Sequence, residues 1–391
     1  MTSRVETKAR DAGLRSQDGQ KPVGWRTKLR SEWLLLLFAA LALVLALLDP
    51  HPLADYRRWL QLPTLAGLLG LMLAIQGIRA SGLVQHAASA LAARVHSLRA
   101  LGMLLVASAA LLATVLTNDV SLFLIVPLTL AIGGISNLPV ARMAVLEALA
   151  VNAGSTLSPI GNPQNLLLWQ HSQWPFPRFV LAMLPVAAVM FALVAALTLA
   201  WLPKGRATFH PAQVDGHPTA APLAVGSLLA LTAMVLAMEY GWALPGALAL
   251  AAVYALMARH VLGRIDWLLL ATFAAIFLGL GHFAALPLVQ HGLDPLALDH
   301  PPTLFVSGIA ASQLISNVPA TVLLLDRAHD PIALAVAVNV GGSGLAIGSL
   351  ANLIALRLAN QPHGLRLFHR VSVPFLLVSA PLVYAVWRWL G

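Results

Sequence analysis

The stretch NAGSTLSPIGNPQN, residues 152–165, decides how this sequence is interpreted. It is rich in amide, hydroxyl, glycine and proline residues, yet it lies between apolar segments long enough to be membrane helices. Exposed to lipid, its free backbone N–H and C=O groups would each cost several kcal/mol. We therefore expect an unwound segment inside the protein that lines a small polar cavity.

The composition is that of an integral membrane protein. Of 391 residues, 59% are hydrophobic and 10% are charged. Apolar runs such as 33–48 and 179–202 are long enough to cross a hydrocarbon core of about 30 Å. The polar stretches 1–31 and 203–221 are too short to bury a core. We expect one polytopic domain and no soluble catalytic domain, and the absence of Cys excludes disulfides and thiolate metal sites.

The net charge of +9 is better explained by membrane topology than by nucleic acid, because basic residues mark cytoplasmic loops. Residues 1–31 carry eight Lys and Arg, and no small-residue cleavage site follows them. This favours a retained cytoplasmic tail over a signal peptide.

The second half of the chain repeats the pattern of the first. NAGSTLSPIGNPQNL (152–166) aligns with NVGGSGLAIGSLANL (339–353) at an offset of 187, and LTND (116–119) aligns with ISNV (315–318) at 199. VQH at 84–86 recurs at 289–291, an offset of 205. Matched polar, Gly/Pro-interrupted segments are typical of a secondary transporter with its site near the bilayer midplane. The alternative is a pair of helix kinks whose free backbone groups are hydrogen-bonded by neighbouring helices.

Charge predicts how the elements cross the membrane. With a cytoplasmic N-terminus and the first hairpin re-entrant, 19 of the 24 Lys and Arg lie on the inner side. A hairpin that crossed fully would reverse this bias, so the positive-inside rule supports two inverted halves. The expected elements are helices near 33–49, 62–79, 178–202, 222–238, 242–258, 266–289 and 372–390, broken helices 139–168 and 331–356, and hairpins within 100–130 and 303–325.

The expected fold is thus an all-α polytopic membrane protein of two inverted repeats, with about nine crossings and two re-entrant hairpins. Its organisation is a basic tail (1–31), repeat one (32–202), a cytoplasmic linker (203–221), and repeat two with one extra helix (222–391). The amphipathic stretch 83–98 is expected along the inner interface, connecting moving and fixed parts.

The two hairpin tips and the two broken segments resemble the ion transporter superfamily, which includes citrate and dicarboxylate carriers and arsenite–antimonite efflux pumps. The resemblance is carried by Thr117-Asn118-Asp119, Ser316-Asn317-Val318 and the two runs quoted above. In dicarboxylate carriers of this group, a Ser-Asn-Thr tip in each hairpin binds sodium and substrate carboxylate. The Asn and the preceding hydroxyl carry over here, and the third position does not. The resemblance implies an elevator-like alternating-access carrier.

The candidate binding residues suit two kinds of ion. Asn118, Asn162 and Asn317 are expected to cap half-helices whose positive ends favour an anion. Unwound carbonyls and nearby hydroxyls suit a small cation, and glycines let the backbone approach closely. The alternative is that the Asn residues only cap and brace the hairpins. The full candidate set is Thr117, Asn118, Asp119, Asn152, Gly154, Ser155, Thr156, Asn162, Asn165, Ser316, Asn317, Asn339, Gly341, Gly342, Ser343 and Asn352.

Two acids at membrane depth, Asp119 and Glu147, are candidates for coupling to a proton or cation. Asp119 could instead stabilise the first turn of its helix, and Glu147 could pair with Arg142. For His282, a hydrogen bond in the core is favoured over a proton relay.

The expected function is secondary active transport of a small ion, an inorganic or carboxylate anion, coupled to proton or sodium. An arsenite/antimonite-type efflux pump or a cation/proton antiporter is the alternative. A channel is disfavoured by the apolar spans, and an enzyme by the lack of HExxH, GxSxG and P-loop motifs. No metal and no cofactor are expected beyond the coupling ion. The expected partners are the small ion, the lipid bilayer of the plasma (inner) membrane and a second copy in a homodimer, without nucleic acid.

Overall fold

The computed structural model describes residues 32–92, 94–209 and 220–390. The tail expected at 1–31 and the middle of the linker expected at 203–221 lie outside this part. In the described residues the fold is helical, with two isolated β-bridges near 97–209. Seven of the described helices are long and apolar enough to cross a membrane. The chain is therefore an all-α polytopic membrane protein.

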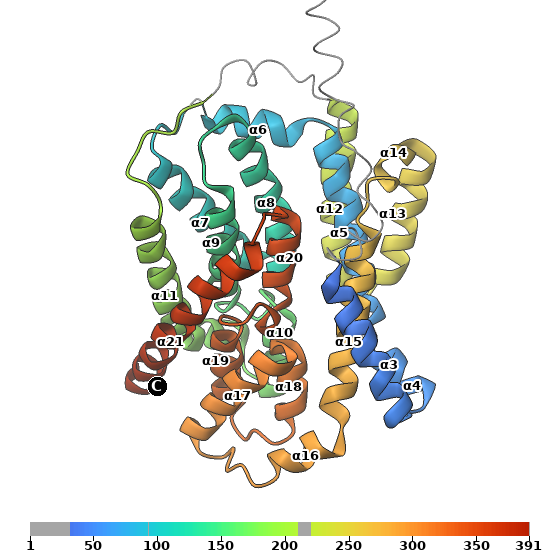
Figure 1. Ribbon diagram of the computed structural model, residues 1–391, viewed down its shortest axis with the longest axis vertical. Coiled ribbons are helices and arrows are strands. Elements are labelled where there is room, and N and C mark those ends of the chain that lie inside the picture. The colour runs from blue at the N-terminus through green and yellow to red at the C-terminus, as the bar shows by residue number, and fades with distance from the viewer. Residues whose placement is uncertain (1–31, 93, 210–219, 391) are drawn as a thin grey trace, which may run out of the picture.

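The helices form two bundles that lie side by side (Figure 1). The first, which we call the scaffold bundle, pairs α3 with α15 and α5 with both α12 and α13. The repeat predicts that α3 corresponds to α13 and α5 to α15. The α3–α15 and α5–α13 pairings are then equivalent, and α12 is the extra helix. The scaffold bundle consists of α3 (Trp33–Leu48), α4 (Leu53–Trp59), α5 (Leu62–Ala80), α12 (Ala221–Glu239), α13 (Ala243–Met257), α14 (Arg259–Leu262) and α15 (Trp267–Ala285).

The second bundle, which we call the site bundle, holds both hairpins and both broken helices. Helices α7 (Leu98–Val115) and α8 (Asn118–Ile135) form hairpin one, and α17 (Pro301–Ile315) and α18 (Asn317–Leu325) form hairpin two. The broken helices and the two long outer helices complete the bundle: α9 (Val140–Ser155) with α10 (Pro163–Ser172), α19 (Pro331–Gly341) with α20 (Leu350–Ala359) through the 3₁₀ turn η2 (Ala346–Gly348), α11 (Phe176–Trp201) and α21 (Gly364–Leu390).

Two short helices connect the bundles at opposite ends of the molecule. Helix α6 (Leu83–Ala92) lies across one end and leads into hairpin one, and α16 (Pro287–Leu293) lies at the other end and leads into hairpin two (Figure 1). The repeated VQH triplets fall in these two connectors. Their placement at opposite ends is the arrangement that inverted repeats require.

Two expected helices begin or end elsewhere. The helix expected at 266–289 ends at Ala285, and Pro287 starts α16. The proline ring disfavours helical geometry at the preceding residue, and Leu286 is indeed extended with ψ 134°. The last helix starts at Gly364 rather than near 372. The repeats are also interleaved, since each contributes helices to both bundles.

Apolar side chains cover the outside of the scaffold bundle. Leu229 of α12 and Leu256 of α13 are 65% and 87% exposed. A helix that is apolar on every side and still exposed is suited to lipid. In contrast, residues 143–155 of α9 are all buried, so the polar break is enclosed by protein.

Candidate functional site

Each hairpin is bonded to the broken helix of its own repeat. Thr114 Oγ1 donates to the Gly154 carbonyl at 3.0 Å, and Gln313 Nε2 donates to the Gly341 carbonyl at 2.6 Å. Thr114 and Gln313 are separated by the same offset of 199 as the hairpin tips, and Gly154 and Gly341 by 187. The duplication predicted from sequence is therefore realised as the same contact made twice.

The two asparagines that open the breaks, Asn152 and Asn339, each donate a hydrogen bond to the other repeat. Asn152 Nδ2 donates to Asn352 Oδ1 at 2.8 Å, and Asn339 Nδ2 donates to Asn165 Oδ1 at 2.5 Å. All four side chains are at most 4% exposed. The pairs are equivalent at the offset of 187, so each repeat's break is held by the second half-helix of the other repeat.

The side-chain oxygens of the same two asparagines also accept hydrogen bonds, one of them from each repeat's equivalent position. Ser349 Oγ donates to Asn152 Oδ1 at 3.0 Å, and Asn162 Nδ2 donates to Asn339 Oδ1 at 2.9 Å. Ser349 and Asn162 are again equivalent positions, each preceding a second half-helix. In this structure the amide groups of Asn152 and Asn339 are thus occupied by protein.

The caps of the half-helices are partly as expected. Asn162 caps α10, since its Oδ1 accepts from Asn165 N–H at 2.8 Å and Pro163 occupies the first helical position. The caps expected at Asn118 and Asn317 are wrong, because α8 and α18 begin at those residues. Thr117 Oγ1 caps α8 by accepting from Val120 N–H at 3.4 Å.

Ser316, which precedes α18, lies at φ 72° and ψ 154°. This region is favourable essentially for glycine only, and a residue held there stores of order 1–3 kcal/mol of strain. Such outliers cluster at active sites and ligand clamps, and Ser316 lines a small cavity between the two bundles.

A small cavity lies where the two bundles meet, and we call it the central cavity. Four helices of the site bundle, α8, α10, α18 and α20, begin at its wall, through Asn118, Pro163, Asn317 and Leu350. The scaffold bundle closes the other side with Gln61, Thr64, Ile276, Phe277 and Leu280. The cavity volume is about 40 Å³. Helix N-termini carry partial positive charge and free N–H groups, so their convergence favours an anion.

Asp119 is the only charged side chain among the described residues that line the central cavity. It is 7% exposed, and its Oδ1 is buried without a hydrogen-bond partner. An unpaired buried polar atom is costly, and a buried acid at membrane depth is a candidate functional residue by default.

The predicted site residues therefore separate into layers. Asn118, Asp119, Ser316 and Asn317 line the central cavity. The network behind it holds Asn152, Ser155, Thr156, Asn162, Asn165, Asn339, Gly342 and Asn352, and Thr117 caps α8. Ser343 is buried, with its hydroxyl unpaired.

Two of the predicted glycines serve helix packing. A Cβ on Gly154 would lie 2.0 Å from the Ala110 carbonyl oxygen of hairpin one, and a Cβ on Gly341 would lie 2.7 Å from the Ser312 Cβ of hairpin two. Both positions thus exclude side chains because a hairpin packs directly on them.

Two expectations about ionisable residues are wrong. Glu147 does not pair with Arg142: its Oε1 accepts from Thr129 of α8, whereas Arg142 donates to the Trp201 carbonyl at 2.7 Å. Glu147 is fully buried and is absent from the lining of the central cavity. His282 has no hydrogen bond in the core: neither ring nitrogen has a hydrogen-bond partner, and the Asp49 carboxylate lies 3.7 Å from Nε2.

A wider cavity, which we call the vestibule, adjoins the central cavity on the side of α16. It measures about 330 Å³ and shares Gln61, Phe277 and Pro319 with the central cavity. Arg58 of the scaffold bundle lines it, together with Arg327 and the adjacent Asp326, which follow α18. The charged residues that line the vestibule are thus two Arg and one Asp.

At the opposite end an ion-pair cluster ties the bundles together. Arg357 of α20 lies 2.8 Å from Glu32 Oε1 and 3.0 Å from Asp266 Oδ2, the residues that precede α3 and α15. These ion pairs join α20 of the site bundle to the starts of α3 and α15 in the scaffold bundle.

Sequence reasoning missed the scaffold side of the central cavity. Gln61 and Thr64 lie at the start of an ordinary apolar helix, and Phe277 and Leu280 lie within another. No motif distinguishes them. They belong to the site only because the scaffold bundle packs against the hairpin tips.

Known proteins similar to this chain are membrane proteins and transporters. The citrate transporter family profile matches residues 25–331. The chain is 41% identical over 324 residues to inner membrane protein YbiR of Escherichia coli (strain K12), covering 83% of this chain and 87% of the relative. It is 32% identical over 255 residues to an uncharacterized transporter of Methanocaldococcus jannaschii, covering 64% and 68%. It is 31% identical over 126 residues to the silicon efflux transporter LSI3 of Oryza sativa subsp. japonica, covering 32% and 26%.

Proposed function

The chain belongs to the citrate transporter family and is a membrane transporter rather than an enzyme, and from this premise we propose that it carries a small inorganic or carboxylate anion. We propose that transport is by elevator-like alternating access, coupled to protons or sodium. The convergence of four helix N-termini on the central cavity is the observation that carries the proposal.

The anion preference rests on what lines the cavity. Asn118, Asn317 and Ser316 supply hydrogen-bonding groups beside the starts of α8 and α18. Half-helix N-termini aimed at an anionic group are a recurring solution in secondary transporters. An anion bound here would be held by oriented dipoles, without a Lys or Arg among the lining residues.

The size of the cavity favours a compact substrate. A volume of about 40 Å³ compares with roughly 10–15 Å³ of such space needed for one water molecule. A compact oxyanion or its protonated acid fits this conformation better than a tricarboxylate. We accordingly rank inorganic oxyanions above citrate. One relative is named a silicon efflux transporter, and an arsenite-type substrate would meet the same size limit.

The elevator proposal is supported by how the bundles are joined. Along the chain they are connected through α6, through α16 and through the segment between α11 and α12. Contacts between the bundles include α5 with α8, α15 with hairpin two, and the Arg357 ion pairs. The site bundle carries both hairpin tips and both broken helices, so it could move as one unit. Movement toward the α6 end would separate Arg357 from Glu32 and Asp266 and close the vestibule.

Asp119 is the proposed coupling group. An ionised carboxylate would repel a neighbouring anion, and a proton or a sodium ion at Oδ1 would remove that repulsion. Substrate and coupling ion should therefore bind together. The same unpaired carboxylate is the observation that favours the second candidate, a cation/proton antiporter.

Purified protein in liposomes can test the proposal. Vesicles loaded with phosphate, sulfate, arsenite, silicic acid or citrate are assayed for saturable exchange with and without proton and sodium gradients. We expect exchange of a compact inorganic species, and a cation carried with none of the anions would favour the antiporter. The Asn317→Ala variant should lose exchange, whereas the exposed control variant Gln170→Ala should retain it.

A further inference from the structure

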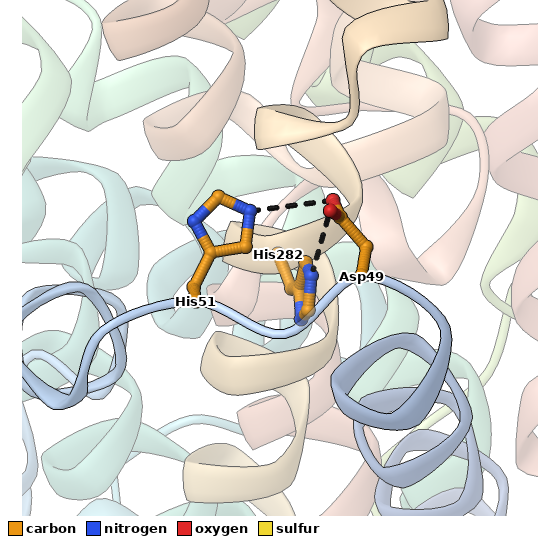
Figure 2. A group of neighbouring side chains, drawn as sticks. All are labelled: Asp49, His51 and His282. Atoms are coloured by element: carbon orange, nitrogen blue, oxygen red, sulfur yellow. Dashed lines mark hydrogen bonds and ion pairs between the residues drawn. The ribbon is translucent and has the colours of Figure 1, made fainter.

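Away from the central cavity, three potential metal ligands meet at the α16 end of the scaffold bundle. Asp49 and His51 lie on the short segment between α3 and α4, and His282 lies near the end of α15 (Figure 2). Figure 2 shows both imidazole rings directed toward the Asp49 carboxylate. We propose that these residues form a binding site for a divalent transition-metal ion of the zinc type. The proposal does not rest on the transport function.

The spacing of the ligand atoms suits a tetrahedral ion. Asp49 Oδ2 lies 3.3 Å from His51 Nε2 and 3.7 Å from His282 Nε2, and all three ligand atoms lie within 4.8 Å of one another. Ligands about 2.0 Å from a tetrahedral zinc ion are separated by about 3.3 Å. The two edges at Asp49 are thus within about 0.4 Å of the required length, and the two imidazole nitrogens lie within 4.8 Å of each other.

The state of His282 is a second, independent observation. The residue is 1% exposed, and neither of its ring nitrogens has a hydrogen-bond partner. The Asp49 carboxylate, 3.7 Å from Nε2, is beyond hydrogen-bond distance, so no hydrogen bond replaces the hydration that the buried imidazole has lost. Its ring is instead stacked on Trp59, with centroids 4.8 Å apart and 23° between the planes. A metal ion at Nε2 would supply the missing interaction.

The surroundings of His51 also match a metal site. Its second nitrogen, Nδ1, lies 3.1 Å from Asp55 Oδ2. A carboxylate on the far nitrogen of a ligating histidine fixes the tautomer and raises the basicity of the ligand. The side chains of Asp49 and His51 are 37% and 26% exposed, so an ion from solvent can reach them.

The ligand types decide the class of ion. Imidazole nitrogens suit zinc, copper, nickel and iron, whereas magnesium and calcium prefer oxygen ligands. Three protein ligands leave a fourth tetrahedral position open to water. With neither a thiolate nor a redox partner at the site, zinc is the ion that we expect to be bound.

The consequence of binding would be local to the scaffold bundle. The ion would tie the α3–α4 segment to α15, which otherwise pack through apolar contacts and the His51–Trp59–His282 ring cluster. Trp59 and Gly281 also line the vestibule. A bound ion would therefore stiffen one wall of the vestibule without contacting the central cavity.

Titration of metal-free, tag-free purified protein with Zn²⁺ tests the site. We expect one equivalent to bind, a higher unfolding temperature with Zn²⁺ and none of that shift with Mg²⁺. Co²⁺ at the same site should give the visible absorption of a tetrahedral complex. His51→Ala and Asp49→Asn should abolish high-affinity binding, and Asp55→Asn should weaken it about 10–100-fold. His171→Ala, which removes an exposed histidine elsewhere, should bind as the wild type does.

The wild-type titration can overturn the proposal by itself, whatever the variants do. A metal-free protein that takes up no zinc and shows no thermal shift contradicts it. So does retention of the full stoichiometry and affinity in both His51→Ala and Asp49→Asn. Because binding and unfolding are measured without transport, failure of this proposal is distinguishable from failure of the proposed function.

Discussion

Asn152 and Asn339 are equivalent residues of the two inverted halves, and each donates its side-chain amide to the second half-helix of the other half. The distances are 2.8 Å from Asn152 Nδ2 to Asn352 Oδ1 and 2.5 Å from Asn339 Nδ2 to Asn165 Oδ1. The two breaks are therefore a single structural unit. This distinguishes bracing asparagines from those that face the central cavity.

The bracing role predicts a stability loss shared by both repeats. Asn152→Ala and Asn339→Ala each leave buried partners unpaired, at a cost of about 1–3 kcal/mol per group. Thermal unfolding in detergent should show both variants destabilised, with Gln170→Ala unchanged. In a double-mutant cycle, Asn152 and Asn352 should couple by roughly 0.5–3 kcal/mol. Additive effects of the two substitutions would contradict the bracing contact.

The asparagines at the hairpin tips should behave differently. Asn118 and Asn317 line the central cavity, so alanine at either position removes a contact that we propose for the substrate. We expect exchange in liposomes to fall at least about tenfold, the equivalent of roughly 1.4 kcal/mol, with an unfolding temperature near that of the wild type. Normal exchange in both variants would place the substrate elsewhere.

Asp119→Asn should uncouple transport from the ion gradient. The amide keeps the size of the side chain but can neither bind a proton nor neutralise a cation. Substrate exchange should persist, whereas accumulation driven by a proton or sodium gradient should disappear. If the variant still accumulates substrate with the same ion dependence, Asp119 only stabilises its helix, and the buried Glu147 becomes the next residue to test.

The ion-pair cluster at Arg357 should open during transport. The chain has no Cys, so Arg357→Cys with Asp266→Cys provides a unique pair for a thiol-specific cross-linker. Cross-linking should stop exchange, and a cleavable linker should restore it once reduced. The single Arg357→Cys variant treated in the same way is the control. Full exchange by a completely cross-linked protein would show that the bundles do not separate at this point.

Topology can be tested by labelling single cysteines. Arg206, Arg366 and Asp299 are exposed. With the N-terminus cytoplasmic, Cys at 206 and 366 should react from the cytoplasm, and Cys at 299 from outside. Reaction of positions 206 and 299 from the same face would refute the re-entrant hairpins and the inverted arrangement together.

Much of the candidate site could be predicted from sequence, because the signal is local. Asn162-Pro163 shows where a half-helix restarts, and the capping bond to Asn165 N–H is present. The predicted cap of α8 differs from the observed one by one residue. Asn118 is the first residue of α8 instead of its cap, because the hydroxyl of Thr117 takes that role.

The duplication, the breaks and the hairpins could be predicted from the amino-acid sequence alone. Composition, spacing and charge encode these features along the chain, and the repeat offsets survive as paired contacts. Which polar groups face the cavity, and which bond to each other, depends on how the two halves pack together. Asn152 and Asn352 are 200 residues apart, and Asp49 and His282 lie in different helical regions of the scaffold bundle. Such pairs have no signature in sequence, because interleaving of the inverted repeats alone brings them within hydrogen-bonding or ligand distance.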